Sequence, residues 1–202
     1  MDVRVRWMRM VPALLALTLL AAACSDDGGD DAAGGTSGGD QAAAAPFGTA
    51  CSQLPASGAG SVGDMMTQPV ATAAASNPLL TALVADLELA GLTDTLNGSD
   101  GLTVFAPTND AFAAAGEADP DGMAAMMADP TGDFAGLLSY HVVEGQLAPD
   151  QLAGEHTTLE GSTLTVEGSG ESFTVNGTAM VVCGDIHTDN ATVYVIDGVL
   201  HP

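Results

Sequence analysis

Apolar residues follow two different spacings along this chain, and each spacing predicts a different kind of element. Residues 61–76 favour short helical pieces interrupted by Pro69, and further short helices are predicted at 123–127 and 134–139. The clearest helix is predicted from Asn77, as its N-cap, to about residue 90. Its core-facing side chains would be Leu79, Leu80, Leu83, Leu87 and Ala90.

From residue 157 onward apolar and polar residues alternate with a period of two, which is typical of strands. Short strands are predicted between Gly or Asn-Gly turns, and Asn176-Gly177 predicts a hairpin turn of the primed type. The segments concerned are 163–166, 173–175, 179–182 and 192–196, and an earlier strand is predicted at 140–143. Helices followed by antiparallel strands indicate one domain of the α+β class.

The stretch 103–112 predicts a corner where a strand passes directly into a helix. Thr103 and Phe105 suit a half-buried strand, and Pro107 ends it because proline cannot donate to a β-ladder. Thr108 is a good helix N-cap, and the helix would continue through Phe112. No nucleophile, metal cluster or phosphate-binding loop accompanies this corner, so the residues indicate a module that binds rather than catalyses.

The beginning of the chain has the pattern of a secretory signal peptide at residues 1–23. Arginines precede an apolar stretch that is short for a membrane span, and small residues follow it. Three alanines stand directly before Cys24, which resembles a bacterial lipobox with Ala21 in place of the usual leucine. We therefore expect lipid attachment at Cys24; the alternative is ordinary cleavage after Ala22 or Ala23, with an incidental thiol.

Residues 24–46 carry Asp, Gly, Ala, Ser, Thr and Gln without periodicity, which is the composition of a flexible acidic linker. The expected organisation is a signal peptide at 1–23, a lipid-attached linker at 24–46 and one folded domain at 47–202. The protein would then be extracytoplasmic, lipid-anchored to the cell membrane and partly secreted.

Charge limits the partners of the expected mature chain. The sequence has 26 acidic residues and three basic ones, with a formal net charge of −23, and all three arginines lie within the first nine residues. Such a balance argues against nucleic acid and against anionic lipid headgroups. It favours basic or cation-bridged partners, although a solvated acidic surface is the simpler interpretation.

Cysteine use gives a further expectation. If Cys24 carries lipid, Cys51 and Cys183 remain, and an exported protein most simply pairs them in a disulfide. The alternative is two buried free thiols.

Three blocks in order resemble the signature of the fasciclin-like domain family. They are T-V-F-A-P-T-N-D-A-F at 103–112, L-L-S-Y-H-V-V at 137–143 and V-Y-V-I-D-G-V-L-H-P at 193–202, where His201 replaces a usual apolar residue. The resemblance covers about residue 51 to the end and implies a twisted antiparallel β-wedge with short helices in its N-terminal half. The expected fold-signature residues are Thr103, Phe105, Pro107, Thr108, Asn109, Phe112 and Asp197.

Within that family, residues 69–83 and the cysteines at 51 and 183 resemble the mycobacterial secreted and lipid-anchored surface antigens, whose equivalent cysteines form a disulfide. The resemblance implies a non-enzymatic surface module that acts in cell adhesion or matrix contact. We expect a monomeric domain with a protein or glycan ligand, membrane attachment through Cys24, and no cofactor.

Tyr140 and His141 are candidate adhesion residues, because the matching region of animal members is tied to integrin contact. The favoured alternative is structural: two strand-borne side chains whose polar tips satisfy buried backbone groups.

Asp185, His187 and Asp189 alternate, and in an extended strand they would share one face that could hold a divalent cation. We favour a polar edge there and predict no metal site.

Two other classes of function stay open on the residues alone. Many carboxylates could serve a carbohydrate-active hydrolase, but no G-x-S-x-G motif or paired nucleophile is present. An acidic envelope protein that buffers cations is the other alternative. The formal glycosylation acceptors at Asn97, Asn176 and Asn190 are interpreted as turns.

Overall fold

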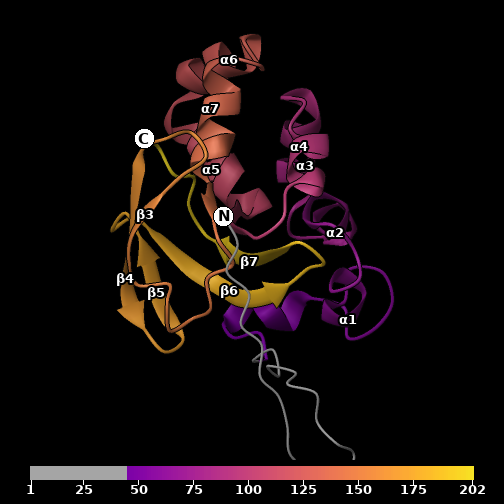
Figure 1. The fold of residues 1–202 in the computed structure, drawn as a ribbon. Coiled ribbons are helices and arrows are strands. Elements are labelled where there is room, and N and C mark those ends of the chain that lie inside the picture. The colour runs from indigo at the N-terminus through magenta and orange to yellow at the C-terminus, as the bar shows by residue number, and fades with distance from the viewer. Residues whose placement is uncertain (1–44) are drawn as a thin grey trace, which may run out of the picture. The chain divides into compact units, whose positions relative to one another are not determined.

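A computed structural model describes residues 45–202 of the chain, and Figure 1 shows the arrangement of its elements. The predicted signal peptide, Cys24 and nearly all of the predicted linker lie outside the described residues. The expected start of the domain at residue 47 coincides with a backbone bridge, because Phe47 and Gly184 exchange N–H···O bonds of 3.1 and 2.8 Å.

Short helices fill the first half of the described chain, as the apolar spacing predicted. The clearest predicted helix begins later than expected, at Thr81 rather than directly after an N-cap at Asn77. The cause is local: the Asn77 backbone is extended, and its side-chain Oδ1 accepts from the Leu79 N–H, which forms a turn before the helix. The helical segments are η1 (Thr49–Gln53), α1 (Val62–Met65), α2 (Val70–Ser76), α3 (Thr81–Leu89), α4 (Thr93–Gly98), α5 (Asn109–Ala118), α6 (Pro120–Ala128) and α7 (Asp133–Tyr140).

The described strands form one curled, seven-stranded sheet in the order β2-β1-β7-β6-β5-β4-β3. Every pair is antiparallel except β1 with β7, which run parallel from Leu102↔Ala191 to Pro107↔Ile196. A bridge between Val143 and Thr158 joins the two ends of the sheet and nearly closes it. The strands are β1 (Leu102–Pro107), β2 (Val142–Glu144), β3 (Gly154–Thr157), β4 (Thr163–Ser169), β5 (Ser172–Val175), β6 (Ala179–His187) and β7 (Ala191–Ile196).

The strand-to-helix corner at residues 103–112 is confirmed. Thr108 Oγ1 accepts from the Ala111 N–H at the start of α5, and the Thr108 N–H donates to the last residue of β7. Asn109 joins this corner to α3: its Oδ1 accepts from the Ala82 N–H, and its Nδ2 donates to the Pro78 carbonyl at 2.9 Å each. The corner therefore fixes a helix pair against the sheet.

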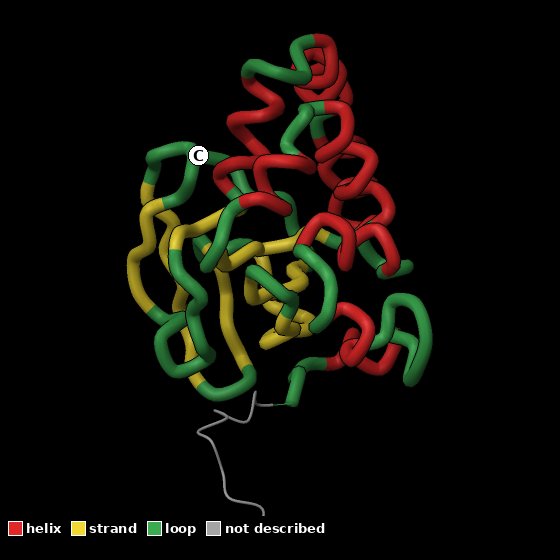
Figure 2. Tube along the Cα trace, turned by 45° about the vertical axis from the view of Figure 1, so that its right-hand side comes forward, coloured by secondary structure: helices red, strands yellow, loops and turns green. Residues whose placement is uncertain are grey.

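Two apolar cores lie on opposite faces of the central strands, because successive side chains of a strand point to opposite sides. Side chains such as Val104 and Val193 pack against the helices. Phe105 and Tyr194 belong to the other core, inside the curled sheet, where their rings stack with centroids 5.9 Å apart. Figure 2 shows the helices gathered on one side of the strands.

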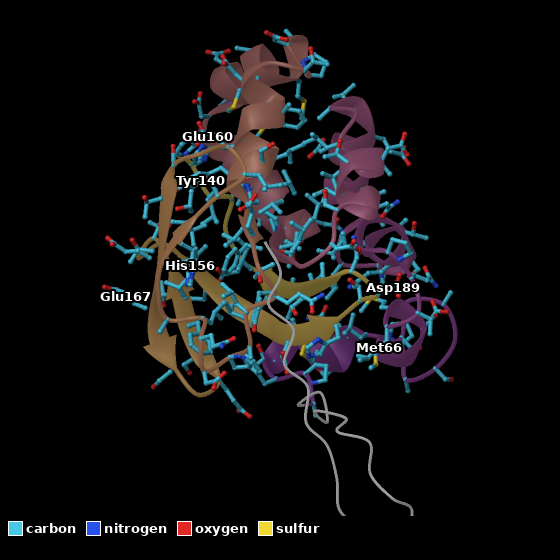
Figure 3. All side chains as sticks on the ribbon, viewed as in Figure 1. Met66, Tyr140, His156, Glu160, Glu167 and Asp189 are labelled. Carbon is cyan, nitrogen blue, oxygen red and sulfur yellow. A yellow bond between two sulfur atoms is a disulfide. The ribbon has the colours of Figure 1, made fainter. Side chains whose placement is uncertain are left out.

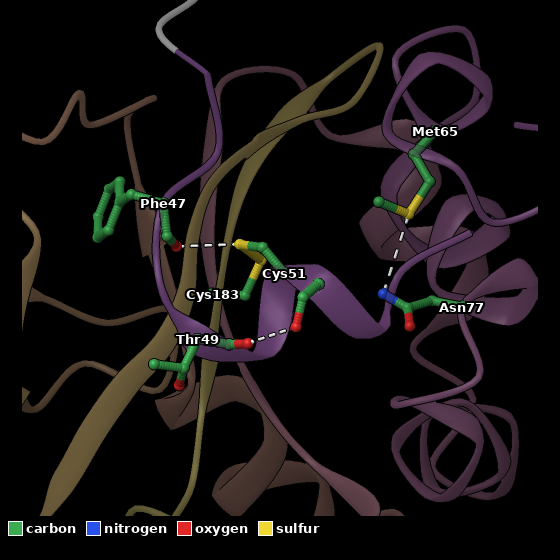
Figure 4. The surroundings of a disulfide bond; sticks show 7 residues. Phe47, Thr49, Cys51, Met65, Asn77 and Cys183 are labelled. Carbon is green, nitrogen blue, oxygen red and sulfur yellow. Dashed lines mark hydrogen bonds between the residues drawn. A yellow bond between two sulfur atoms is a disulfide. The ribbon is translucent and has the colours of Figure 1, made fainter. Parts of the chain in front are cut away.

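Two further expectations are met in the second half. Asn176 and Gly177 have φ values of 49° and 66°, which is the geometry of a type I′ hairpin turn. Cys51 and Cys183 form a disulfide with their Cα atoms 5.0 Å apart, and it joins η1 to β6 (Figure 4). The segment ahead of α1 is thereby attached to the centre of the sheet.

Candidate functional site

The strand position expected for Tyr140 and His141 is wrong. Tyr140 is the last residue of α7, His141 is its C-cap, and the strand starts only at Val142. The helix continues because Phe134, Leu137 and Leu138 present a buried helical face to the core. The β-branched residues after the pair then begin the strand.

His141 is a buried connector whose ring joins two segments. One ring nitrogen, Nδ1, lies 2.8 Å from the Leu137 carbonyl, and the other, Nε2, accepts from the Leu200 N–H at 2.9 Å. Only a neutral ring with its proton on Nδ1 makes both bonds. Burial lowers the pKa of His141 to about 4, against the bond to Leu137, and nearby His201 lowers it further. His141 is therefore neutral at pH 7.

Tyr140 is also buried, with 3 % of its surface exposed. Its hydroxyl donates to the Thr163 carbonyl at 3.1 Å and accepts from Asn176 Nδ2 at 2.8 Å. The same Asn176 accepts from the Thr165 N–H, so the ring joins the end of α7 to the β4–β5 hairpin. Both members of the Tyr-His pair thus satisfy interior groups, and both side chains are buried. Figure 3 labels Tyr140 among the side chains.

The other signature residues have comparable contacts. Thr103 Oγ1 donates to the Gly145 carbonyl and accepts from the Leu147 N–H, which holds the loop after β2 against β1. Asp197 Oδ1 accepts from the Met180 N–H at 2.7 Å, which ties the C-terminal segment to β6. These side chains position backbone, so the signature describes the scaffold.

The arrangement expected for Asp185, His187 and Asp189 is also wrong. A bulge interrupts β6 between Cys183 and Ile186, and Asp185 takes a left-handed backbone conformation with φ 59°. Asp185 is buried, and its Oδ1 lies 3.2 Å from His187 Nε2, while Asp189 stands exposed in the β6–β7 loop. Burial raises the pKa of Asp185, and the neighbouring imidazole opposes that shift.

Within residues 45–202, no three His, Cys, Asp or Glu side chains lie close enough together to hold a metal ion. The described helices also include none with the length and apolar character needed to cross a bilayer.

Asn190 has a structural role that the sequence did not reveal. It lies in the expected turn, between β6 and β7, and in addition it is buried and makes three bonds across the helical layer. Its Oδ1 accepts from the Val70 N–H at 2.8 Å, and its Nδ2 donates to the Leu96 and Ser99 carbonyls at 2.7 and 2.6 Å. These partners lie far from Asn190 in the sequence, so no pattern of adjacent residues could have predicted its structural role.

Two surface hollows flank α7. One, of about 350 Å³, is lined by the ionisable side chains of Asp133, Glu160 and His201 together with apolar residues such as Met126 and Leu137. The other, of about 320 Å³, lies between α4 and α7 and is lined by aliphatic and hydroxyl side chains. The residues on either side of Tyr140 and His141, which we call the Tyr-His block together with this pair (137–143), thus border accessible surface. The side chains of Tyr140 and His141 themselves are buried.

Known proteins match this chain over most of its length. The model of the family described as "Fasciclin domain" matches residues 78–202. The cell surface glycolipoprotein MPB83 of Mycobacterium bovis is 45% identical over 167 residues, covering 77% of this chain and 71% of that protein. The immunogenic protein MPB70 of the same species is 43% identical over 163 residues, covering 77% of this chain and 81% of that protein.

More distant matches extend the comparison. Protein sll1483 of Synechocystis is 35% identical over 130 residues, covering 64% of this chain and 71% of that protein. Among solved structures, a FAS1 domain pair from the insect cell adhesion molecule Fasciclin I superposes with a TM-score of 0.61 at 17% identity. That match covers 69% of this chain and 52% of the other, so the chain spans about half of the domain pair.

Proposed function

The chain belongs to the fasciclin domain family, and from this premise we propose that it is a non-enzymatic, extracytoplasmic surface protein whose single domain mediates adhesion or surface interaction. The observation that carries the proposal is the 45% identity to a cell surface glycolipoprotein over 77% of the chain. Because the polar groups of Tyr140 and His141 are used in buried contacts, a ligand would bind instead on the outer faces of the helices and of the sheet.

The proposed attachment to the membrane runs through Cys24, and residues 24–46 would hold the domain away from the bilayer. This part of the proposal rests on the lipobox-like sequence and on a relative whose name describes a glycolipoprotein. Replacement of Cys24→Ala tests it: the wild-type chain should fractionate with membranes, and the variant should be released. Equal membrane fractions for both chains would contradict lipid anchoring.

The charge of the domain supports a ligand that is cationic or uncharged. Beyond residue 9 the chain contains no lysine or arginine, so its carboxylates have no such partner within the domain. An anionic protein or polysaccharide would meet repulsion over most of the surface. We therefore propose a basic or neutral protein or glycan as the ligand.

A pull-down of the full chain against envelope and host-surface extracts tests this function. We expect saturable capture by the folded chain, and none by the same chain after reduction and unfolding, which keeps the charge and loses the fold. The captured ligand should be recovered with its mass unchanged after prolonged incubation. Equal capture by the unfolded chain, or steady release of sugar from a polysaccharide, would contradict a binding module.

A further inference from the structure

An open groove runs between α4 and α7, on the helical side of the molecule. Figure 1 shows α3 and α4 standing apart from α6 and α7 above the sheet, and side chains from both groups border the groove. Its volume of about 320 Å³ lies at the lower end of the range for small-molecule sites. The residues that line it are Leu92, Thr95, Leu96, Ser99, Leu138, Ser139, Val142 and Leu159.

The lining has a distinctive chemistry. It consists of aliphatic side chains and three hydroxyls, with no aromatic ring and no ionisable group. Leu96, Leu138 and Val142 are buried and form an apolar floor, whereas Leu159 keeps 37 % of its surface exposed. The hydroxyls of Thr95 and Ser139 can each donate or accept a hydrogen bond at the edge.

We propose that this groove binds the aliphatic chain of an uncharged amphiphile. The aliphatic floor fits a hydrocarbon chain, and the hydroxyls at the edge fit a neutral polar head such as an alcohol or a glyceride. A carboxylate or phosphate head is disfavoured, because the domain carries many carboxylates and no lysine or arginine to compensate them. Binding of such an amphiphile would be a property separate from surface adhesion and would give this face its own class of ligand.

The Tyr-His block forms one wall of this groove. Leu138, Ser139 and Val142 line it, and they flank the buried pair on both sides. The bonds from Tyr140 to Thr163 and from His141 to Leu200 hold the end of α7 in place. The buried pair therefore positions the wall without touching the ligand.

A titration with 1-decanol tests the proposal, because this probe has one aliphatic chain and an uncharged head. The full chain carrying Cys24→Ala excludes an acyl group at that position. We expect saturable binding of one decanol per chain by calorimetry, with NMR shifts concentrated at Leu96, Leu138 and Leu159. Decanoate, with the same chain and a carboxylate head, should bind at least about tenfold more weakly.

Two variants and one matched control locate the site. Ser139→Phe fills the groove and should abolish decanol binding, and Leu159→Ala should weaken it about tenfold through lost apolar contact. Leu89→Ala removes another exposed leucine, on α3 and outside the lining, and should leave binding unchanged. Melting curves establish that each variant folds, and Thr95→Trp replaces Ser139→Phe if that variant does not.

Three results would overturn the proposal. The first is no saturable binding of decanol, or binding that Ser139→Phe leaves intact. The second is decanoate binding as strongly as decanol, which would remove the preference for an uncharged head. The third is a concentration-dependent dimer in sedimentation that Ser139→Phe dissociates, which would make a second copy of the chain the occupant.

Discussion

The buried ring of His141 makes the stability of this domain depend on pH in a defined way. The folded protein holds the pKa of His141 at about 4, whereas the ordinary value is 6.5. The unfolded chain therefore binds a proton in the range between these values, and the folded chain does not. The contribution of His141 to stability is fully present well above pH 6.5 and falls as the pH drops toward 4, because the unfolded chain takes up a proton that burial and the bond from the Leu200 N–H exclude from the folded ring.

The size of the effect follows from the difference between the two pKa values. At 1.36 kcal/mol per pKa unit, the contribution of His141 should fall by about 3 kcal/mol between pH 7.5 and pH 4. Burial also raises the pKa of Asp86 to about 6, which changes stability with pH in the opposite direction. A comparison with a chain that lacks only the histidine removes this second effect.

Urea unfolding followed by far-UV circular dichroism, at constant ionic strength, measures the effect in the wild type and in His141→Asn. The single tryptophan, Trp7, lies outside the domain, so backbone dichroism is the better signal. The difference in unfolding free energy between the two chains should shrink by about 3 kcal/mol from pH 7.5 to pH 4. A difference that changes by less than about 1 kcal/mol would refute the buried, neutral ring.

Further perturbations test the disulfide, the buried contacts of Asn190, the buried carboxylate of Asp185 and the acidic charge of the domain. Replacing both Cys51 and Cys183 by serine should lower the free energy of unfolding by about 2–5 kcal/mol in urea, since the disulfide closes a separation of 132 residues; an unchanged midpoint would contradict this. Asn190→Ala should cost about 3 kcal/mol, because buried backbone groups lose their partner, and a loss below about 1 kcal/mol would count against that role. Asp185→Asn should stabilise the fold more at pH 8 than at pH 5, since burial raises the Asp185 pKa; calorimetry at both values decides. The melting temperature should rise with added sodium chloride as salt screens the acidic residues, and a flat response would contradict net self-repulsion.

The sequence predicted the parts of this fold that local chemistry determines. Thr108 acts as the N-cap of α5, and the turn at Asn176-Gly177 has the expected primed geometry. The pairing of Cys51 with Cys183 followed from the number of cysteines and the expected export. Each of these features depends on residue type at adjacent positions or on a simple count.

The misplaced features depend on tertiary contacts. Tyr140 looked like a strand residue because of the β-branched residues after it, but the buried face of α7 extends the helix through it. The position of Asp185 depends on a bulge, and a bulge is set by the pairing of two strands. The parallel pairing of β1 with β7 likewise joins segments far apart in the sequence.

The same distinction applies to the candidate site. The sequence singled out Tyr140 and His141, yet it is their neighbours Leu138, Ser139 and Val142 that line the groove. Leu159 and the residues of α4 complete it from distant parts of the chain. A groove assembled from separate elements has no motif of its own, so only the fold reveals it.

If the Tyr-His pair builds the scaffold and ligands bind on the surfaces that this scaffold holds, a change to the pair should alter stability and leave binding intact. Tyr140→Phe tests this expectation most directly, because it removes one hydroxyl and its bonds to Thr163 and Asn176 while keeping the ring. The melting temperature and the binding of the captured surface ligand should be measured on the same preparation. We expect a lower melting temperature with binding per folded molecule unchanged, whereas unchanged melting with lost binding would contradict a scaffold role for Tyr140.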